Sequence, residues 1–291
     1  MAVRPLKWWL LIGLTLFSAI AAMMFGVSRA DALQVMLKPS TPKLGDTVSV
    51  WIASKSQNSP SVEISGQQYP VFAIAPNRWR AFIPTTPLDK PGTRQVIVSA
   101  DGQQQTLAMP LASRQFPTQS LWIDESGGGL EPTDYEWDTV SAFKKLVTPQ
   151  KFWQGAFLRP NDGEITTIFG VQRYYNGVFA EDYYHRGVDY AGAYGSPVIS
   201  PADGYVRLVG TVAQGFRLHG NTVGVDHGQG VLSIFLHLSK IYVKDGDFVK
   251  AGQVVGALGS TGASTGPHLH WGLYVNGQAV DPVPWRYESI E

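Results

Sequence analysis

Two closely spaced pairs of residues in this 291-residue sequence could do chemistry together, and the first is His268-Leu269-His270. It opens the run His-Leu-His-Trp-Gly-Leu-Tyr-Val, which is typical of a strand. Successive side chains of a strand point to opposite faces, so both imidazoles point the same way, about 6–7 Å apart. That spacing suits a metal ligand beside a catalytic base. Two exposed surface histidines are the alternative.

The second pair is His185 and Asp189, four residues apart. Gly187 and the β-branched Val188 disfavour a helix between them. A strand also returns residues i and i+4 to one face, so the two side chains share a face in either conformation. An imidazole and a carboxylate placed in this way can bind a metal ion. A local ion pair is the ordinary alternative.

The other three histidines stand alone. His237 lies in the apolar run 233–238, where it is either a hydrogen-bonded core histidine or a residue of a site. His219 and His227 each lie beside a glycine in a loop or turn, and we expect them to have no chemical role. The sequence contains no cysteine, which excludes a thiol nucleophile, a cysteine-bound zinc and a disulfide framework.

Two serine motifs match catalytic patterns but lack their context. Gly262-Ala263-Ser264-Thr265-Gly266 fits the nucleophile elbow, which requires a following helix, whereas Pro267 and a strand follow here. Ser141 and Lys144 fit S-x-x-K without the partner motifs of that enzyme class. Neither motif indicates a serine nucleophile.

Taken in chain order, these residues resemble the M23 metallopeptidases, the lysostaphin-type cell-wall endopeptidases. That family carries H-x-x-x-D, later an isolated histidine in a strand, and then H-x-H. The resemblance covers about residues 150–285. It extends through Ile168-Phe169-Gly170, Arg173 to Gly177, Gly195-Ser196-Pro197-Val198, Gly220-Asn221-Thr222-Val223, Asp226-His227-Gly228, His237-Leu238-Ser239 and Gly259 to Trp271.

The resemblance implies that His185, Asp189 and His270 bind one zinc ion per chain, with His237 and His268 beside the metal-bound water. Two imidazoles and one carboxylate leave the ion a net positive charge and an open position, which is typical of catalytic zinc. Zinc lowers the pKa of its water toward about 7 and polarises the scissile carbonyl. One histidine would move the proton and the other would stabilise the oxyanion, and the sequence leaves that assignment open.

Two further features follow from the resemblance. Some family members use a tyrosine near the metal, and Tyr175 and Tyr184 are the candidates here. The glycine-rich segment 259–266 is expected to form a wall of an open substrate groove, because glycine lets the backbone approach an extended peptide closely.

The elements that must position these residues are short strands. From Phe152 onward glycine is dense, and we expect strands at 166–169, 204–211, 221–226, 233–238 and 269–275 with no long helix. Residues 33 to about 115 also predict strands, such as 48–52 and 95–99, with a hairpin turn at Asp101-Gly102. The predicted fold is all-β, with an Ig-like β-sandwich at 31–118 and an antiparallel β-sheet peptidase domain at 151–291.

Between the two β-rich parts, residues 119–150 predict a linker and a strap helix. Thr133-Asp134-Tyr135-Glu136 fits a helix capping box. Pro149 is expected to end the helix. We expect one apolar stripe that docks between the domains, formed by Trp137, Val140, Phe143 and Val147.

The first thirty residues predict export. Arg4 and Lys7 precede an uncharged stretch from Trp8 to Ser28, which fits either a cleaved signal peptide or an uncleaved membrane anchor. Either one places the remainder in the periplasm or cell envelope. Removing residues 1–30 deletes three of the 23 basic residues and none of the 23 acidic ones, so the mature chain has no basic excess for nucleic acid.

The sequence therefore predicts an exported zinc endopeptidase that cuts peptide cross-links or stem peptides of peptidoglycan during wall remodelling. Peptidoglycan peptides are the expected partner, and no partner protein is evident. Two alternatives remain at this point. One is a catalytically silent M23-like protein that binds wall or activates another hydrolase, and the other is a structural zinc domain.

Overall fold

The computed structural model describes residues 33–56, 58–122 and 131–288. The expected signal or anchor at 1–30 lies outside these residues, as do residues 123–130 of the predicted linker. Within the described ranges, no helix has the length and apolar character needed to cross a membrane. The chain from Leu33 onward forms one compact unit.

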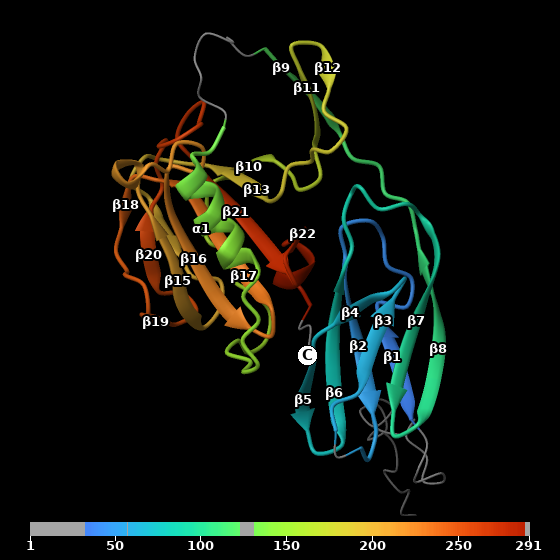
Figure 1. Ribbon diagram of the computed structural model, residues 1–291. Helices are drawn as coiled ribbons and strands as arrows, with labels where there is room; N and C mark the ends of the chain where they lie inside the picture. The colour runs from blue at the N-terminus through green and yellow to red at the C-terminus, as the bar shows by residue number, and fades with distance from the viewer. Residues whose placement is uncertain (1–32, 57, 123–130, 289–291) are drawn as a thin grey trace, which may run out of the picture. The chain divides into compact units, whose positions relative to one another are not determined.

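The N-terminal part consists of two four-stranded antiparallel sheets (Figure 1). Their inward-facing residues, among them Val50, Val62 and Val98, form one shared core. Asp101 and Gly102 take positive φ angles of 50° and 74° and join two strands as the expected hairpin turn. This is the architecture of a β-sandwich, while its likeness to Ig domains stays a prediction. The first sheet has the order β1 (Gln34–Lys38), β2 (Thr47–Ala53), β6 (Arg78–Pro84), β5 (Val71–Ala75), and the second β4 (Gln67–Tyr69), β3 (Ser61–Ile64), β7 (Gly92–Ala100), β8 (Gln103–Leu111).

The C-terminal part is built on one large antiparallel sheet, as expected. Its central strands are buried on nearly every residue because both faces of the sheet are covered. The order is β10 (Glu164–Thr167), β13 (Val188–Ala191), β21 (His268–Val275), β17 (Val231–Leu238), β16 (Asn221–Gly228), β15 (Gly204–Gly210), β19 (Phe248–Val249), with β22 (Gln278–Val280) paired to β21. The three neighbours β13, β21 and β17 carry four of the five predicted site residues.

Two small sheets complete the chain. One joins β14 (Pro197–Ile199), β20 (Val254–Ala257) and β18 (Lys240–Ile241). The other joins β12 (Val178–Phe179), β11 (Gln172–Tyr175) and β9 (Thr118–Leu121), with β9 parallel to β11. Short 3-10 turns lie at Val212–Gln214 and Pro284–Arg286.

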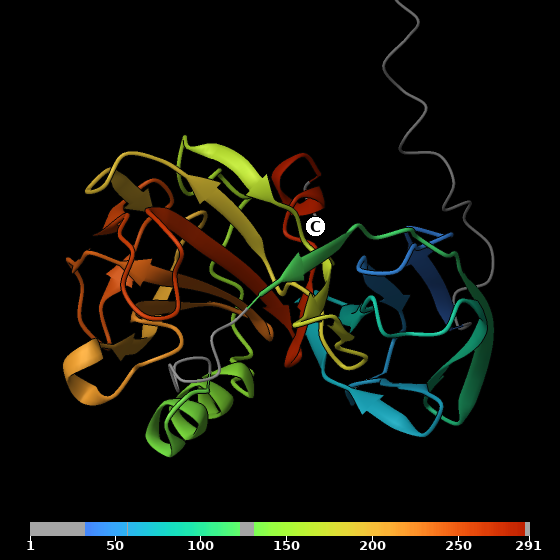
Figure 2. The same ribbon diagram turned by 90° about the horizontal axis from the view of Figure 1, so that it is seen from above.

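Helix α1 (Asp134–Lys144) lies beside the large sheet (Figure 1, Figure 2). Thr133 caps it as predicted, accepting a hydrogen bond of 3.1 Å from the Glu136 N–H. Phe143 packs over Gly224, where an added Cβ would lie 2.6 Å from the phenyl ring. Helix α1 therefore packs directly on the backbone of β16 (Asn221–Gly228) at Gly224.

The apolar stripe predicted for this helix is partly wrong. Val140 and Phe143 are buried, but Trp137 is 62% exposed and Val147 41% exposed. The helix ends at Lys144, with Lys145 as its C-cap, so Val147 lies beyond it. The buried face runs instead through Glu136, Val140 and Phe143, the i, i+4, i+7 spacing of one helix side. An acidic residue at the start of that face concealed it in the sequence.

The sandwich and the large sheet are in contact. Asn276 Nδ2 donates to the Phe82 carbonyl at 2.8 Å, and Arg114 pairs with Asp281 at 2.8 Å. Phe82 also packs against the tilted rings of Trp153 and Trp285 and belongs to the larger core. The two β-rich parts therefore share buried packing.

Candidate metal centre

The strand pairing brings the predicted ligands together. Asp189 on β13 lies directly opposite His270 on β21 in an antiparallel register. His185 lies three residues before β13, and its main chain is held by hydrogen bonds to Gly170 and Val171. Three residues separated by up to 85 positions in sequence therefore meet at one end of the sheet.

Their ligand atoms form a small triangle. Asp189 Oδ1 lies 2.9 Å from His270 Nδ1 and 3.1 Å from His185 Nε2, and the two nitrogens are 3.0 Å apart. All three residues are buried. Within the described part of the chain, this is the one group of three such side chains with ligand atoms close enough to hold a metal ion.

The donor set fits a zinc ion. Three atoms bound tetrahedrally at about 2.0–2.1 Å from one ion would lie about 3.3 Å apart, close to the separations found here. The Nδ1–H of His185 donates to the Ile168 carbonyl at 2.9 Å, which leaves the Nε2 lone pair directed at the cluster. Two nitrogens and a carboxylate oxygen thus converge on one point, where a cation satisfies all three.

The charge states also fit metal binding. Burial raises the pKa of Asp189, but its close contacts with the rings of His185 and His270 outweigh burial and hold that pKa well below its usual range. Burial lowers the pKa of His270 to about 4, against the opposing effect of Asp189. An ionised carboxylate and a neutral imidazole are the forms that bind metal ions.

His237 and His268 form a second pair, with ring centroids 4.7 Å apart. The Nδ1–H of His237 donates to the Thr261 carbonyl and that of His268 to the Gly266 carbonyl, both at 2.8 Å. A carbonyl oxygen can only accept, so each neutral ring carries its lone pair on Nε2. Burial, with His268 and His270 nearby, lowers the pKa of His237 to about 3. Both rings are therefore held in the tautomer of a proton acceptor.

The backbone at His237 is unusual. Its φ angle is +64°, in the left-handed region that side chains other than glycine rarely adopt. Its N–H donates to the His219 carbonyl at 3.0 Å. Gly259 packs against this strand end, where an added Cβ would lie 2.6 Å from the His237 carbonyl oxygen.

Two glycines of segment 259–266, Gly259 and Gly262, pack closely on the protein's own backbone. A Cβ at Gly262 would lie 2.4 Å from the Gly220 nitrogen, and a Cβ at Gly220 would lie 2.4 Å from the Thr261 carbonyl oxygen. These glycines let the loop pack on the protein's own backbone. The open substrate groove stays a prediction.

The two remaining histidines lie outside the metal cluster. His227 donates from Nδ1 to the Asp203 carbonyl and accepts at Nε2 from the Ser233 hydroxyl, both at 2.9 Å. His219 donates from Nδ1 to Glu136 at 2.6 Å. Both have their hydrogen bonds within the fold.

The two tyrosine candidates lie in different surroundings, and only Tyr184 has its hydroxyl bound in the core. Tyr184 is buried and donates to the Ala279 carbonyl at 3.1 Å, so its hydroxyl is occupied in the core. Tyr175 accepts from Arg173 at 3.3 Å and packs on Tyr183, over whose ring the Arg173 guanidinium also lies. Burial lowers the pKa of Arg173, but Tyr183, Tyr175 and Asp189 together raise it above its usual value. Tyr175 was among the predicted candidates, whereas the contacts of Tyr183 with it and with Arg173 were not predicted.

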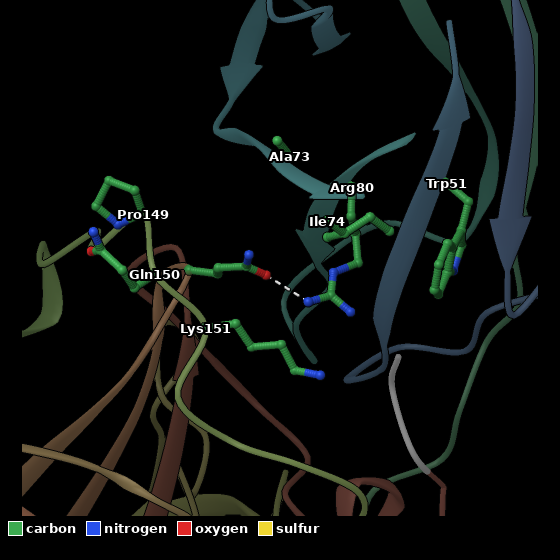
Figure 3. Close-up of a pocket in the computed structure, with 8 residues that line it drawn as sticks. Trp51, Ala73, Ile74, Arg80, Pro149, Gln150 and Lys151 are labelled. Atoms are coloured by element: carbon green, nitrogen blue, oxygen red, sulfur yellow. Dashed lines mark hydrogen bonds between the residues drawn. The ribbon is translucent and has the colours of Figure 1, made fainter. Parts of the chain in front are cut away.

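A separate cavity lies away from these residues (Figure 3). It has a volume of about 500 Å³. Arg80, only 1% exposed, donates to Gln229 at 2.5 Å across it and lies over the rings of Phe82 and Trp153. None of the predicted site residues lines it; its lining is Trp51, Ala73, Ile74, Arg80, Pro149, Gln150, Lys151 and Gln229.

A buried His–Asp–His group on an antiparallel sheet, with two further histidines paired beside it, is the site of a metallopeptidase class. Residues 183–282 match the sequence profile of the family described as Peptidase family M23. Residues 183–282, which include all five predicted site residues, therefore form a peptidase M23 domain.

The curated proteins to which this chain is similar include a metalloprotease and a peptidoglycan endopeptidase. An uncharacterized metalloprotease of Haemophilus influenzae is 46% identical over 99 residues, covering 34% of this chain and 20% of the relative. The peptidoglycan DD-endopeptidase ShyA of Vibrio cholerae is 42% identical over 97 residues, covering 33% and 22%. The chain thus spans about a fifth of the length of these curated relatives. A crystal structure from Pseudomonas aeruginosa described as a peptidase M23 covers 86% of this chain and 96% of its own, with 27% identity and a TM-score of 0.63.

Proposed function

We propose that this protein is a zinc-dependent endopeptidase that hydrolyses peptide bonds in peptidoglycan cross-links or stem peptides. The observation that carries the proposal is the ligand triangle of His185, Asp189 and His270 beside the paired rings of His237 and His268. The name of the Vibrio cholerae relative, a peptidoglycan DD-endopeptidase, supports the substrate class.

In this proposal one zinc ion per chain would be held by His185 Nε2, Asp189 Oδ1 and His270 Nδ1. When bound there, zinc supplies a Lewis acid that acidifies water and polarises the scissile carbonyl. The hydrogen bond from His185 to the Ile168 carbonyl orients the first ligand. The ionised Asp189 contributes a single negative charge, so the centre keeps a net positive charge.

His237 and His268 would move the proton. Each presents an unprotonated Nε2, because the Nδ1–H is bound to a main-chain carbonyl. The ring that accepts a proton from the attacking water becomes a donor and can pass that proton to the leaving amine. The other ring would lie beside the oxygen on which negative charge develops. Which of the two is the base is left open.

We also propose an extracytoplasmic location. The substrate of the named relative is cell-wall peptidoglycan. The predicted signal or anchor at 1–30 points the same way, although its cleavage and any membrane anchoring remain proposals.

Digestion of purified sacculi by the zinc-loaded protein tests the function. Mass spectrometry of the released muropeptides should find new amino termini and unchanged glycan strands. New reducing sugar ends without new amino termini would contradict the substrate assignment. Binding to sacculi without any cleavage, with zinc present, would favour the silent wall-binding protein instead.

A further inference from the structure

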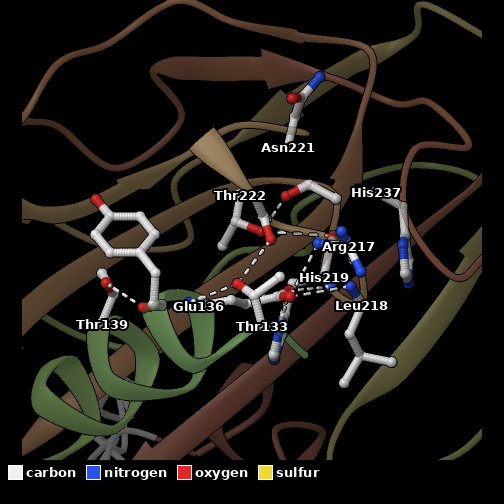
Figure 4. A network of polar contacts seen from close by, with 12 residues as sticks. Thr133, Glu136, Thr139, Arg217, Leu218, His219, Asn221, Thr222 and His237 are labelled. Atoms are coloured by element: carbon white, nitrogen blue, oxygen red, sulfur yellow. Dashed lines mark hydrogen bonds and ion pairs between the residues drawn. The ribbon is translucent and has the colours of Figure 1, made fainter. Parts of the chain in front are cut away.

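The first turn of α1 holds the segment 215–219 at both ends (Figure 4). The Thr133 hydroxyl donates to the Gly215 carbonyl at 2.9 Å. Glu136 Oε2 accepts from the main-chain N–H groups of Arg217 and Leu218 at 2.9 and 3.1 Å. Glu136 Oε1 accepts from both the main-chain N–H and the ring Nδ1–H of His219, each at 2.6 Å.

This carboxylate is fully buried, with 0% of Glu136 exposed. Burial alone would raise its pKa, but the hydrogen bonds from the ring and main chain of His219 and from Leu218 outweigh burial and lower the pKa to about 2. A buried charge is stable only when its hydrogen-bonding capacity is filled. Four donors meet that condition, so the segment and the helix are tightly coupled.

The segment 215–219 is linked to His237 by a hydrogen bond. The His219 carbonyl accepts the main-chain N–H of His237 at 3.0 Å, at the residue with the left-handed backbone. The Thr261 carbonyl holds the His237 ring at 2.8 Å. Thr261 lies in a loop that is itself bound to the segment, because the Ala263 N–H donates to the Leu218 carbonyl at 3.0 Å. Both carbonyls that fix His237 therefore lie on or against the segment that Glu136 fixes.

We propose that Glu136 is a positioning residue that sets the place of His237 in the peptidase reaction. The inference rests on the proposed function and goes beyond it. It makes α1, which precedes the family match at residue 183, a part of the active-site architecture. Glu136 acts through His219 and touches no reacting atom.

Glu136→Gln is the informative substitution because it keeps the size of the side chain. Glutamine offers one acceptor oxygen and one NH₂ group in place of two acceptor oxygens. Its NH₂ group would face the N–H groups that one carboxylate oxygen accepts now, so at least two hydrogen bonds are lost and donors oppose donors. The segment must then shift, and His237 with it.

The test measures full-length, zinc-loaded protein on a soluble cross-linked muropeptide. Glu136→Gln should lower kcat by about 10- to 100-fold, the scale of a misplacement of about 1 Å. KM and zinc content should stay within about twofold of wild type. Asp138→Asn, an exposed acid on the same helix, is the matched control and should cleave at the wild-type rate. A wild-type kcat in Glu136→Gln, or a loss explained by missing zinc, would overturn the inference.

Histidine NMR provides a readout independent of activity. The chain has six histidines, so each ring C–H signal can be assigned. In Glu136→Gln the His219 and His237 signals should shift, whereas that of His227, bound to Asp203 and Ser233, should not. An unmoved His237 signal would contradict the positioning role of Glu136, whether or not the wild-type protein cleaves muropeptides. Absence of cleavage by the wild-type protein would count only against the proposed function.

Thr133→Ala is the milder variant if Glu136→Gln does not fold. It removes the hydrogen bond to Gly215 and the N-cap bond from the Glu136 N–H, and it leaves the four bonds to the Glu136 carboxylate. A kcat loss smaller than tenfold together with a shifted His237 signal would support positioning. A lower Tm with unchanged kcat and an unchanged His237 signal would assign the helix a structural role only.

Discussion

Asp189 and His270 face each other across the paired strands β13 and β21, with Oδ1 and Nδ1 2.9 Å apart. The sheet ladder itself thus places two of the three proposed ligands. A one-residue slip of either strand would turn its ligand to the opposite face. The geometry of the proposed metal centre therefore depends on the pairing register of β13 and β21.

The first prediction concerns the ligands. Asp189→Ala and His270→Ala should each lose both zinc and activity, because each removes one corner of the triangle. Elemental analysis of the purified variants and cleavage of sacculi measure the two effects. Full zinc occupancy in both variants would show that the ligand assignment is wrong.

The second prediction separates catalysis from binding. His237→Ala and His268→Ala should keep zinc and sacculus binding while losing at least about a hundredfold in cleavage rate, since the three ligands remain. His227→Ala is the comparison and should stay near wild type when folded. Wild-type cleavage rates in all three variants would favour the wall-binding alternative.

The third prediction concerns acid stability. The pKa of Glu136 is about 2 in the folded protein against an ordinary 4.5. The stabilising contribution of the ionised carboxylate to the free energy of unfolding is therefore full above pH 4.5 and is lost as pH falls through 2. This difference corresponds to about 3 kcal/mol. The gap in unfolding free energy between wild type and Glu136→Gln, measured in urea, should narrow by about that amount over this range. Parallel pH curves would contradict it.

The fourth prediction concerns the packing of α1. Phe143 is 2% exposed and lies against Gly224, so Phe143→Ala should cost about 3–5 kcal/mol of unfolding free energy. Trp137 is 62% exposed, and Trp137→Ala should change it by no more than about 0.5 kcal/mol. Chemical denaturation compares the two. A larger effect of Trp137→Ala would mean that the buried face of the helix has been assigned wrongly.

Side-chain types and their spacing predicted much of the site. Strand alternation places His268 and His270 on one face, and the His–x–x–x–Asp spacing returns Asp189 to the side of His185. The groups that orient these rings could not be predicted, since the acceptors at Ile168, Thr261 and Gly266 are main-chain carbonyls. Every residue carries such a group, so no residue type marks it.

The strap helix shows the opposite limit. Thr133 and Glu136 matched a capping box, and the Thr133 half of it is present. Glu136 turns instead to donors some eighty residues further along, an arrangement that only the folded chain brings about. Local sequence rules assign an acid in a first helical turn to solvent or to the cap. A buried partner from a distant loop overrides them here.

The coupling of α1 to segment 215–219 also affects where the chain could be cut in a domain recombination or an engineered fusion. A recombination or fusion joined at residue 151, where the sequence suggests that the peptidase domain begins, would carry all five histidine and aspartate residues of the site and leave Glu136 behind. The transferable module has to begin before Thr133 to bring its own support for His237. The first residue of a functional, transferable module would then differ from the first residue of the β-sheet domain.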